Sequence, residues 1–403
     1  MEQLNAPQGK FDLERYPRRS NDRLRAWDAA DELVLEYLAG EFAVPADEDG
    51  PTAPTVAGAV DLSGTTVVVN DSFGALAVAL SASMSTGRLV SYGDSFISHR
   101  GTEENLSNNG LEVSSVERVG SLGDLPERID TLVVKLPRSN DLLIDQLARL
   151  APHVHAETVV VGAAMTKHVH RSGLEAFEST IGPTRTSLAK KKARLIVASP
   201  DAGVVPPEPV GPRTFVLDPG NLRVKSHPGV FAPERLDIGT SLFLDNLPDQ
   251  AGQIRIIDLG CGNGVVGLVA LVDNPDAELI FVDESYFAVA SAEATIRENL
   301  GGSTGAEFVV GSGLDDLQGH GPIERGSVDL IFNNPPFHVD HALSDSTAWQ
   351  MFSESHAALR KGGQLWVIGN RHLAYHAKLK RIFGNCDVID SSPKFVVYRS
   401  TRT

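Results

Sequence analysis

Short apolar runs alternate with longer helical patterns along most of the chain. Residues 66–69 and 254–259 are rich in Val, Ile and Leu, and each run ends in a polar or glycine-containing turn. A helical pattern begins after each turn, near Ala75 in the first case and near Val265 in the second. Buried strands followed by helices are typical of right-handed βαβ units. The pattern therefore predicts an α/β fold built on doubly wound, mainly parallel sheets.

The same succession of strands occurs twice. In each half the second strand ends in an acid, Asp94 or Asp283, and the third strand ends at a proline. This shared order predicts two α/β domains of common ancestry. The strands occupy residues 66–69, 88–94 and 130–137 in the first half, and 254–259, 279–283 and 329–336 in the second.

A proline-rich segment lies between the two halves. Five prolines fall within residues 200–212, where no strand or helix period is present. Because proline fixes φ and lacks a backbone donor, this segment is neither helix nor central strand. We predict a first domain over residues 1–200, a linker over 201–212 and a second domain over 213–403.

The strongest local motif is the glycine-rich turn DLGCGNG that follows the strand at 254–259. Glycines let the backbone pass close to a ligand, and an acid at a strand end suits a cationic or hydroxyl-bearing group. The glycines also fit a dinucleotide fingerprint, so their spacing does not decide between a dinucleotide and a cofactor without a pyrophosphate. An acid directly before the glycines would repel a pyrophosphate, which favours S-adenosylmethionine, with its sulfonium and amino groups. The predicted cofactor-binding residues of the turn are Asp258, Gly260, Cys261, Gly262, Asn263 and Gly264.

Two further residues extend the predicted cofactor site. Asp283 ends the next strand, 25 residues after Asp258. At this place in an open α/β sheet, a carboxylate accepts the two hydroxyls of an adenosine ribose. The following strand ends in a loop that contains Ser312, and we expect this loop to flank the adenine. No spacing of His and Cys in the chain predicts a metal site.

The second strong motif is Asn334-Pro335-Pro336-Phe337, which ends an apolar run. The motif lies at the carboxyl edge of the predicted sheet, beside the cofactor turn. The Asn side-chain oxygen and a backbone carbonyl are able to accept both hydrogens of an exocyclic amine, which directs the nitrogen lone pair toward a methyl sulfonium. Phe337 is able to stack on a planar base, as a flipped nucleotide requires. We predict Asn334, Pro335, Pro336 and Phe337 as the catalytic loop; a rigid turn with a core Phe is the simpler alternative.

Together these motifs resemble the bacterial ribosomal-RNA guanine-N2 methyltransferases. DLGCGNG, VDES and NPPFH carry the resemblance in the second half, while NDSFGALAVAL and the C-terminal RHLAYHAKLKRIFGNCDVIDSSPKFVVYR are most similar to the large-subunit members. The resemblance implies two class I methyltransferase domains in tandem, with Rossmann-like sheets, the first domain being degenerate. It also implies methyl transfer from S-adenosylmethionine to N2 of one guanine in 23S rRNA. Residue by residue, it assigns Asp258, Gly260, Gly262 and Asp283 to the cofactor, and Asn334 to Phe337 to the target amine.

Three alternatives stay open at this point. The small-subunit relatives, which act on 16S rRNA, are the nearest one. The NPPF motif is shared with adenine-N6 and glutamine-N5 methyltransferases, so methylation of a protein glutamine is a second possibility. A non-catalytic RNA-binding assembly factor is the third, although the intact glycine-rich turn and Asn334 argue against it.

The first half departs from both motifs. Only Gly74 is left in its turn, and the bulky Phe73 stands where a ligand would need a close backbone approach. Lys135-Leu136-Pro137 replaces the Asn-Pro-Pro sequence and offers no amide acceptor. We predict that the first domain does not methylate and that it binds or positions RNA.

The net charge of −16 argues at first against a polyanionic partner, but the charge is unevenly distributed. Residues 236–356 hold nineteen acids against three bases, whereas residues 357–403 hold nine bases against two acids. A polarised surface is therefore expected, with ribosomal RNA on two basic patches. The predicted RNA contacts are Lys190, Lys191, Lys192 and Arg194 in the first patch, and Arg371, Lys378, Lys380 and Arg381 in the second.

Composition also bears on the compartment. The chain has two cysteines, and its first twenty residues contain no apolar stretch typical of a secretory signal. No run approaches eighteen apolar residues, the length that a membrane span requires. We expect a cytoplasmic protein without membrane contact, and a monomer.

Overall fold

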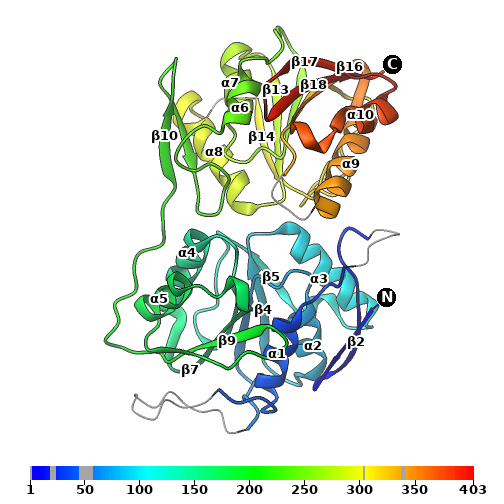
Figure 1. The fold of residues 1–403 in the computed structure, drawn as a ribbon. Helices are drawn as coiled ribbons and strands as arrows, with labels where there is room; N and C mark the ends of the chain where they lie inside the picture. The colour runs from blue at the N-terminus through cyan, green and yellow to red at the C-terminus, as the bar shows by residue number, and fades with distance from the viewer. Residues whose placement is uncertain (1, 19–23, 45–57, 303–304, 337–340) are drawn as a thin grey trace. The chain divides into compact units, whose positions relative to one another are not determined.

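The computed structural model describes residues 2–18, 24–44, 58–302, 305–336 and 341–403, and only the backbone of residues 2 and 341–345. The chain divides into two compact units, Met1–Val210 and Gly211–Thr403. The division falls within the proline-rich segment. In Figure 1 the first unit is coloured from blue to green and the second from green to red.

The first unit consists of a hairpin, a helix and a seven-stranded sheet with helices on both faces (Figure 1). Its strands follow the order β5-β4-β3-β6-β7-β9-β8, in which β9 is antiparallel to β7 and β8. Its main elements are β1 (Glu2–Ala6), β2 (Gly9–Leu13), α1 (Ala29–Leu38), β3 (Thr65–Val69), α2 (Ala75–Ser83), β4 (Arg88–Gly93), α3 (Phe96–Asn108), β5 (Glu117–Gly120), β6 (Ile129–Lys135), α4 (Asn140–Leu150), β7 (Val154–Met165), α5 (Arg171–Thr180), β8 (Thr184–Thr186) and β9 (Ala193–Ala198).

The second unit repeats this plan. Its strand order is β14-β13-β12-β15-β16-β18-β17, with β18 antiparallel to β16 and β17. The two mixed sheets confirm the predicted α/β class. The elements are β10 (Arg213–Leu217), β11 (Leu222–Ser226), α6 (Ile238–Leu244), β12 (Arg255–Leu259), α7 (Val265–Asp273), β13 (Glu278–Asp283), α8 (Tyr286–Leu300), β14 (Ala306–Val310), β15 (Val328–Asn333), α9 (His341–Ala358), β16 (Leu359–Asn370), α10 (Tyr375–Phe383), β17 (Asp387–Ser391) and β18 (Phe395–Thr401).

Each sheet is buried on both faces, which explains its nearly continuous apolar strands. In β12 the side chain of Ile256 joins the core beneath α6, α7 and α8, and the next residue, Ile257, joins the core beneath α9 and α10. In β3, Val68 packs with α1 and α2, whereas Val67 packs with α4 and α5.

No helix within the described ranges is long and apolar enough to cross a membrane.

The registers of the two sheets match residue by residue. Val69 pairs with Tyr92 as Leu259 pairs with Val282, so equivalent positions in these strands lie 190 residues apart. The register therefore equates Asp283 with Gly93, and Asp94 follows one position later. The pairing of Asp94 with Asp283 expected from the sequence was wrong by one residue, because both halves carry an acid next to this strand end.

A second repeated feature fixes the hairpin of each unit to a helix. In the first unit, the side chain of Asn109 exchanges two hydrogen bonds with the backbone of Asp12 in β2, at 2.9 Å each. In the second unit, Asn299 does the same with the backbone of Arg223 in β11, at 2.8 Å. Asn109 and Asn299 are again 190 residues apart, so the hairpins belong to the duplicated plan.

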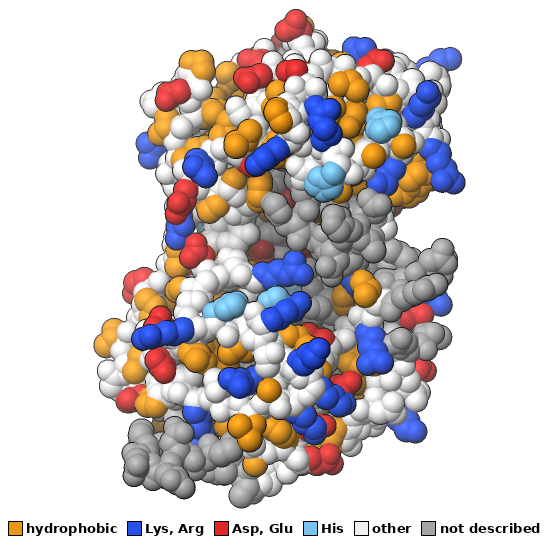
Figure 2. Space-filling model, viewed as in Figure 1, with side chains coloured by type: hydrophobic (Ala, Val, Ile, Leu, Met, Phe, Trp, Pro, Cys, Tyr) orange, Lys and Arg blue, Asp and Glu red, His pale blue; other side chains and the backbone are white. Residues whose placement is uncertain are grey.

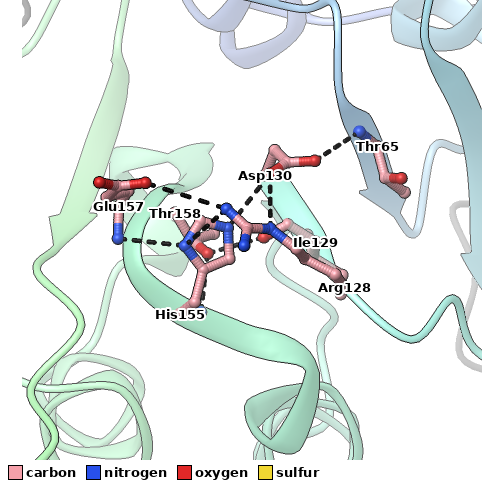
Figure 3. Close-up of polar contacts among 7 residues, drawn as sticks. All are labelled: Thr65, Arg128, Ile129, Asp130, His155, Glu157 and Thr158. Carbon is pink, nitrogen blue, oxygen red and sulfur yellow. Dashed lines mark hydrogen bonds and ion pairs between the residues drawn. The ribbon is translucent and has the colours of Figure 1, made fainter.

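A third repeated feature lies at the amino edge of each sheet. Asp130 at the start of β6 accepts a hydrogen bond from the backbone N–H of Thr65, at 2.8 Å, and Asp329 does so from Arg255, at 2.7 Å. Figure 3 shows how Arg128 and the ring of His155 also converge on Asp130. These hydrogen bonds lower the pKa of Asp130, the Thr65 amide being the largest cause.

We predict that Asp130→Ala lowers the free energy of unfolding of the first unit by about 1.5–3 kcal/mol, the range for hydrogen bonds to a charged group. The loss follows because β3 and β6 would no longer share this acceptor. Urea unfolding, with hydrogen exchange of β3 read by mass spectrometry, measures the effect. Glu157→Ala, at an exposed residue of the same cluster, is the control and should leave the stability unchanged.

Candidate active site

The reversal of strand order brings the two predicted motifs of the second unit together. β12 pairs with β13 on one side and with β15 on the other, and ligands of open α/β sheets bind at the carboxyl edge of such a reversal. The glycine-rich turn follows β12, and Asn334 follows β15. A Cβ placed on Gly260 would lie 3.6 Å from the carbonyl oxygen of Asn334. The predicted cofactor and target motifs therefore adjoin.

The turn after β12 depends on left-handed backbone. Gly260, Gly262 and Gly264 have φ values of +74°, +55° and +75°. Gly264 is also needed for packing, because a Cβ there would lie 2.8 Å from Ala292 of α8. At Gly262 such a Cβ would meet nothing within 4 Å, so this part of the turn faces open space. Gly262 is thus the predicted glycine with the most room for a ligand.

Asp258 lies beneath the turn, with only 3% of its surface exposed. Its Oδ2 accepts a hydrogen bond of 2.9 Å from the backbone N–H of Gly267 in α7. Burial raises the pKa of Asp258 to about 7, and the nearby Asp283 adds to the rise, although the Gly267 hydrogen bond opposes it. Asp258 therefore holds the first turn of α7 against β12 and carries a carboxyl that titrates near neutrality.

Cys261 and Asn263 have structural contacts in the turn. The Cys261 thiol is buried, and burial raises its pKa, so it is held as a neutral thiol. Asn263 donates from Nδ2 to Oγ of Ser226 at 3.2 Å, which ties the turn to the end of β11. Their side chains stabilise the turn around the position predicted for the cofactor.

Asp283 keeps acceptor capacity for a ligand. Its Oδ2 accepts the backbone N–H of Gly262 and its Oδ1 accepts that of Ser285, both at 3.0 Å. A carboxylate has about four acceptor positions, so these two bonds orient the group and leave sites for two hydroxyls. The arrangement fits the ribose of S-adenosylmethionine. Asp283 is the last residue of β13, and at this strand end its two amide donors lie within reach.

The loop that contains Ser312 is held by α9, which the sequence motifs did not indicate. Gln350 donates from Nε2 to the carbonyl oxygen of Ser312 at 3.0 Å. Glu354 accepts the backbone N–H of Leu314 at 2.7 Å, and burial raises its pKa. In the sequence, the only signal for these contacts was a pair of polar residues, Gln350 and Glu354, four positions apart in a helical segment. Within the described residues, no group of three or more His, Cys, Asp and Glu lies close enough to hold a metal ion.

Asn334 has one end of its side-chain amide fixed and the other unpartnered. Its Nδ2 donates to Oγ1 of Thr240 in α6 at 3.4 Å. Its Oδ1 is buried and, among the described residues, has no hydrogen-bond partner. A buried acceptor without a partner is costly unless a ligand satisfies it. Thr240 was not indicated by any sequence motif, because it belongs to a helix ninety residues earlier in the chain.

The residues around Asn334 have different positions. Asn333 ends β15, is fully buried and donates from Nδ2 to the carbonyl oxygen of Leu259 at 2.7 Å; its Oδ1 is likewise unpartnered. This bond fastens the two central strands together at the site edge. Pro335 is buried and Pro336 is exposed. Phe337 lies outside the described residues.

In the first unit, Lys135 occupies the register position of Asn334. Its Nζ forms an ion pair with Asp31 of α1 and lies 3.2 Å from Oδ1 of Asp28. Asp31 is the third residue beyond the N-cap of α1, as Thr240 is beyond the N-cap of α6. The same two positions therefore form a charged pair in the first unit and a neutral pair in the second.

The turn of the first unit keeps left-handed backbone at two of the three equivalent positions, Asn70 and Gly74, and Gly74 is the one glycine retained. Asn70 has φ +59° at the position of Gly260. Asp71 stands at the position of Cys261 and accepts the N–H of Ala77 at 2.8 Å, the amide equivalent to that of Gly267. Burial raises the pKa of Asp71 to about 7, and Asp31 adds to the rise.

The first predicted basic patch is partly engaged within its own unit. Lys190 and Lys191 form ion pairs of 2.6 Å with Glu36 and Glu32 of α1. Lys191 and Lys192 form the turn of a hairpin, with φ values of +49° and +63°, a conformation that usually falls to Asn and Gly. Arg194 follows in β9.

The second predicted basic patch lies mainly on α10. Lys378 and Arg381 both lie over aromatic rings, of Tyr375 and Trp349 respectively. Lys380 and Arg381 are exposed, and α10 contains no acidic residue. Arg371, just before α10, is exposed and donates to the carbonyl oxygen of Ser392. This patch is basic along its whole length.

The sheets and the edge motifs define a protein with two methyltransferase-type units. Two family models match the chain: "RLMG N-terminal domain" over residues 1–202 and "Methyltransferase small domain" over residues 221–399. The chain belongs to the family of the ribosomal RNA large subunit methyltransferase G proteins, as the resemblance in the sequence predicted.

Relatives with that name span the whole chain. The proteins from Streptomyces griseus and Stutzerimonas stutzeri are 49% and 41% identical, and the alignments cover 100% and 99% of both chains, respectively. Among solved structures, the chain is similar to the T. thermophilus 16S rRNA N2 G1207 methyltransferase in complex with AdoMet and guanosine. That match has a TM-score of 0.72, 19% identity and coverage of 100% of this chain and 98% of the other, and it shows a shared fold.

We predict that the second unit loses stability through Asp258 as the pH rises from about 4 to about 7. Its pKa of about 7 in the folded unit lies above the ordinary value of 3.8, so its contribution is fully present below pH 3.8 and is lost as the pH rises through 7. Asp258→Asn should flatten this dependence. Hydrogen exchange of β12 across the pH range is the measurement, with Asp315→Asn, at an exposed residue, as the control.

Proposed function

We propose that this chain transfers a methyl group from S-adenosylmethionine to the exocyclic N2 amine of one guanine in large-subunit ribosomal RNA. The unpartnered, buried Oδ1 of Asn334, next to the glycine-rich turn, is the observation that carries the proposal. Family membership supports the reaction type and the large-subunit substrate. A cytoplasmic location follows from such a substrate; the monomeric state stays a prediction that size-exclusion chromatography checks.

The residues at the edge of the second sheet fit the two substrates. Asp283 has acceptor positions for the ribose hydroxyls, and the turn at Gly262 has room for the methionine part. S-adenosylmethionine, when bound, supplies an electrophilic methyl group on sulfur. Asn334 would accept one hydrogen of the guanine amine at Oδ1 and the second at its backbone oxygen.

Positioning is sufficient for this chemistry. With both amine hydrogens held by Asn334, the nitrogen lone pair would face the methyl group of bound S-adenosylmethionine, so the N–C bond would form as the S–C bond breaks. The methylated nitrogen would then lose its extra proton to water. Thr240 acts as a positioning residue, because its hydroxyl fixes Nδ2 of Asn334 and so determines that Oδ1 faces the amine. The target guanine has to be unpaired or flipped to reach this edge.

We propose that the first unit binds RNA and does not catalyse. Lys135 replaces the acceptor of Asn334 with a donor that is already paired with Asp31. Asn70 and Ser72 place side chains where the second unit has Gly260 and the open turn backbone of Gly262. The intact sheet then serves to present basic residues to the substrate.

The RNA contacts are proposed on both units. Figure 2 shows Lys and Arg side chains spread over this face of each unit. The residues proposed are Lys190, Lys191, Lys192 and Arg194 on the first unit, and Arg371, Lys378, Lys380 and Arg381 on the second. Lys190 and Lys191 would exchange their exposed ion pairs for phosphates at little cost, since such pairs contribute less than about 1 kcal/mol.

Asn334→Ala tests the proposed chemistry. We predict that this variant binds S-adenosylmethionine with unchanged affinity and loses methyl transfer by at least about a hundredfold, the effect of removing a positioning contact. Calorimetry measures binding, and tritium from labelled cofactor, mapped to the nucleotide in total rRNA, measures transfer. Full activity of Asn334→Ala would overturn the assignment.

The same labelling separates the alternative substrates. Label in 16S rRNA would indicate the small-subunit reaction, and label in protein but not in deproteinised RNA would indicate a glutamine methyltransferase. A wild-type chain that binds no S-adenosylmethionine would indicate a non-catalytic assembly factor. Label on N2 of a guanine in 23S rRNA is the expected result.

The variant Lys192→Gly is expected to change the stability of the first unit and its RNA affinity in opposite directions. Glycine relieves the left-handed backbone at φ +63°, so we predict a gain of about 1 kcal/mol in the free energy of unfolding of the first unit. RNA affinity should fall, and the slope of log K against log salt should decrease by about one. Filter binding across a salt series measures both quantities. Asn221→Gly, at an uncharged residue with φ +54°, is the matched control and should leave RNA binding unchanged.

A further inference from the structure

The three tryptophans of the chain differ in exposure. Trp27 and Trp366 are buried, whereas Trp349 on α9 is 36% exposed. The guanidinium of Arg381 on α10 lies over the Trp349 ring, 5.1 Å from its centroid. An exposed indole beside a guanidinium combines an aromatic stacking surface with a positive charge, the two elements that bind unpaired nucleotides.

The packing of α9 on α10 explains why residue 349 is aromatic. It does not explain why the Trp349 ring is exposed to solvent. Trp349, Phe352 and His356 follow helical spacing and lie on one face of α9. Phe352 and His356 meet the rings of Tyr375 and Phe383 edge to face, at 5.3 and 4.9 Å between centroids. In Figure 1 the two helices lie side by side. The Trp349 ring, by contrast, contacts the guanidinium of Arg381 and is partly exposed to solvent.

The place of Trp349 is fixed relative to the candidate active site. Gln350, the next residue, holds the carbonyl oxygen of Ser312. One residue further, Met351 lies against the turn, where a Cβ on Gly260 would be 3.4 Å from its Cε. Trp349 therefore stands at the rim of the same sheet edge, on a helix fastened to both cofactor loops.

The charge of α10, which lies beside Trp349, favours a polyanion. α10 carries Lys378, Lys380 and Arg381 without an acidic residue. Residues 357–403 as a whole hold nine bases and two acids, in a chain of net charge −16. A peptide ligand of ordinary composition would not need this excess, whereas a nucleic-acid strand does.

We propose that Trp349 and Arg381 form a stacking platform for an unpaired nucleotide of the RNA substrate that flanks the target guanine. The inference rests on the proposed function, because only an RNA target presents a flanking base at this edge. Trp349 stacks on the base, and Arg381 contacts the adjoining phosphate while it holds the indole. A target guanine in a single-stranded segment has such unpaired neighbours within reach.

Trp349→Ala, Trp349→Phe and Arg381→Ala in the full chain test the platform. The probes are a ten-nucleotide single-stranded RNA and a duplex of the same length. We expect Trp349→Ala to weaken binding of the single strand about tenfold, within the range for loss of one stacked base, with a smaller effect on the duplex. Trp349→Phe keeps a ring and should lose less than about threefold. Single-stranded RNA should quench the tryptophan fluorescence of the wild type, and this quenching should vanish in Trp349→Phe.

Lys361→Ala is the matched control, because Lys361 is an exposed base at the amino end of β16, opposite the site. It should leave the quenching and the preference for single strands unchanged. Wild-type affinity and quenching in every Trp349 variant would overturn the platform, as would an equal loss of binding in the Phe and Ala variants. If the wild type transfers no methyl group to rRNA but is still quenched, the proposed function fails: Trp349 then stacks on RNA, and its link to a target guanine is overturned. If transfer is normal and Trp349→Ala behaves as wild type, the platform alone fails.

Discussion

Parallel pairing between β12 and β15 is the interaction on which the candidate site depends. The reversal of strand order at this pair brings a glycine-rich turn and an Asn-Pro-Pro loop to one edge, although they are about seventy residues apart in the chain. The bond from Asn333 to the carbonyl oxygen of Leu259 fastens the pair at its end, directly before the unpartnered amide of Asn334. Because the backbone ladder determines these positions, side chains at the edge are free to diverge without loss of the fold.

The first unit shows how far that divergence has gone. β3 and β6 keep the register of β12 and β15, and the amino-edge aspartates Asp130 and Asp329 accept equivalent amides. The differences are concentrated at the carboxyl edge, where one unit carries a neutral pair and the other a buried ion pair. Features that stabilise the sheet were thus kept in both units, and features that would contact ligands changed in one.

The fold class, the family and the two edge motifs could be predicted from the sequence, because each is written in consecutive residues. Apolar runs predict strands, and glycines or prolines at their ends predict turns. Thr240, Gln350 and Glu354 could not be found in this way, since their roles follow from how α6 and α9 pack. The ion pairs of Lys190 and Lys191 join residues more than 150 positions apart, so a run of bases gave no sign of them.

The ion pair between Lys135 and Asp31 limits which single substitutions the first unit tolerates at these two positions. Asp31 is fully enclosed, so replacing Lys135 alone by Asn would leave an uncompensated buried carboxylate, a change that typically costs 3–5 kcal/mol. Changing Asp31 alone would leave the buried lysine with Asp28, at 3.2 Å, as its remaining acidic partner. The neutral pair of the second unit therefore differs from this charged pair by two coupled substitutions, of which the one at Lys135 is harmful by itself. The stability of the first unit therefore opposes an amide acceptor at this position, whatever role the unit has.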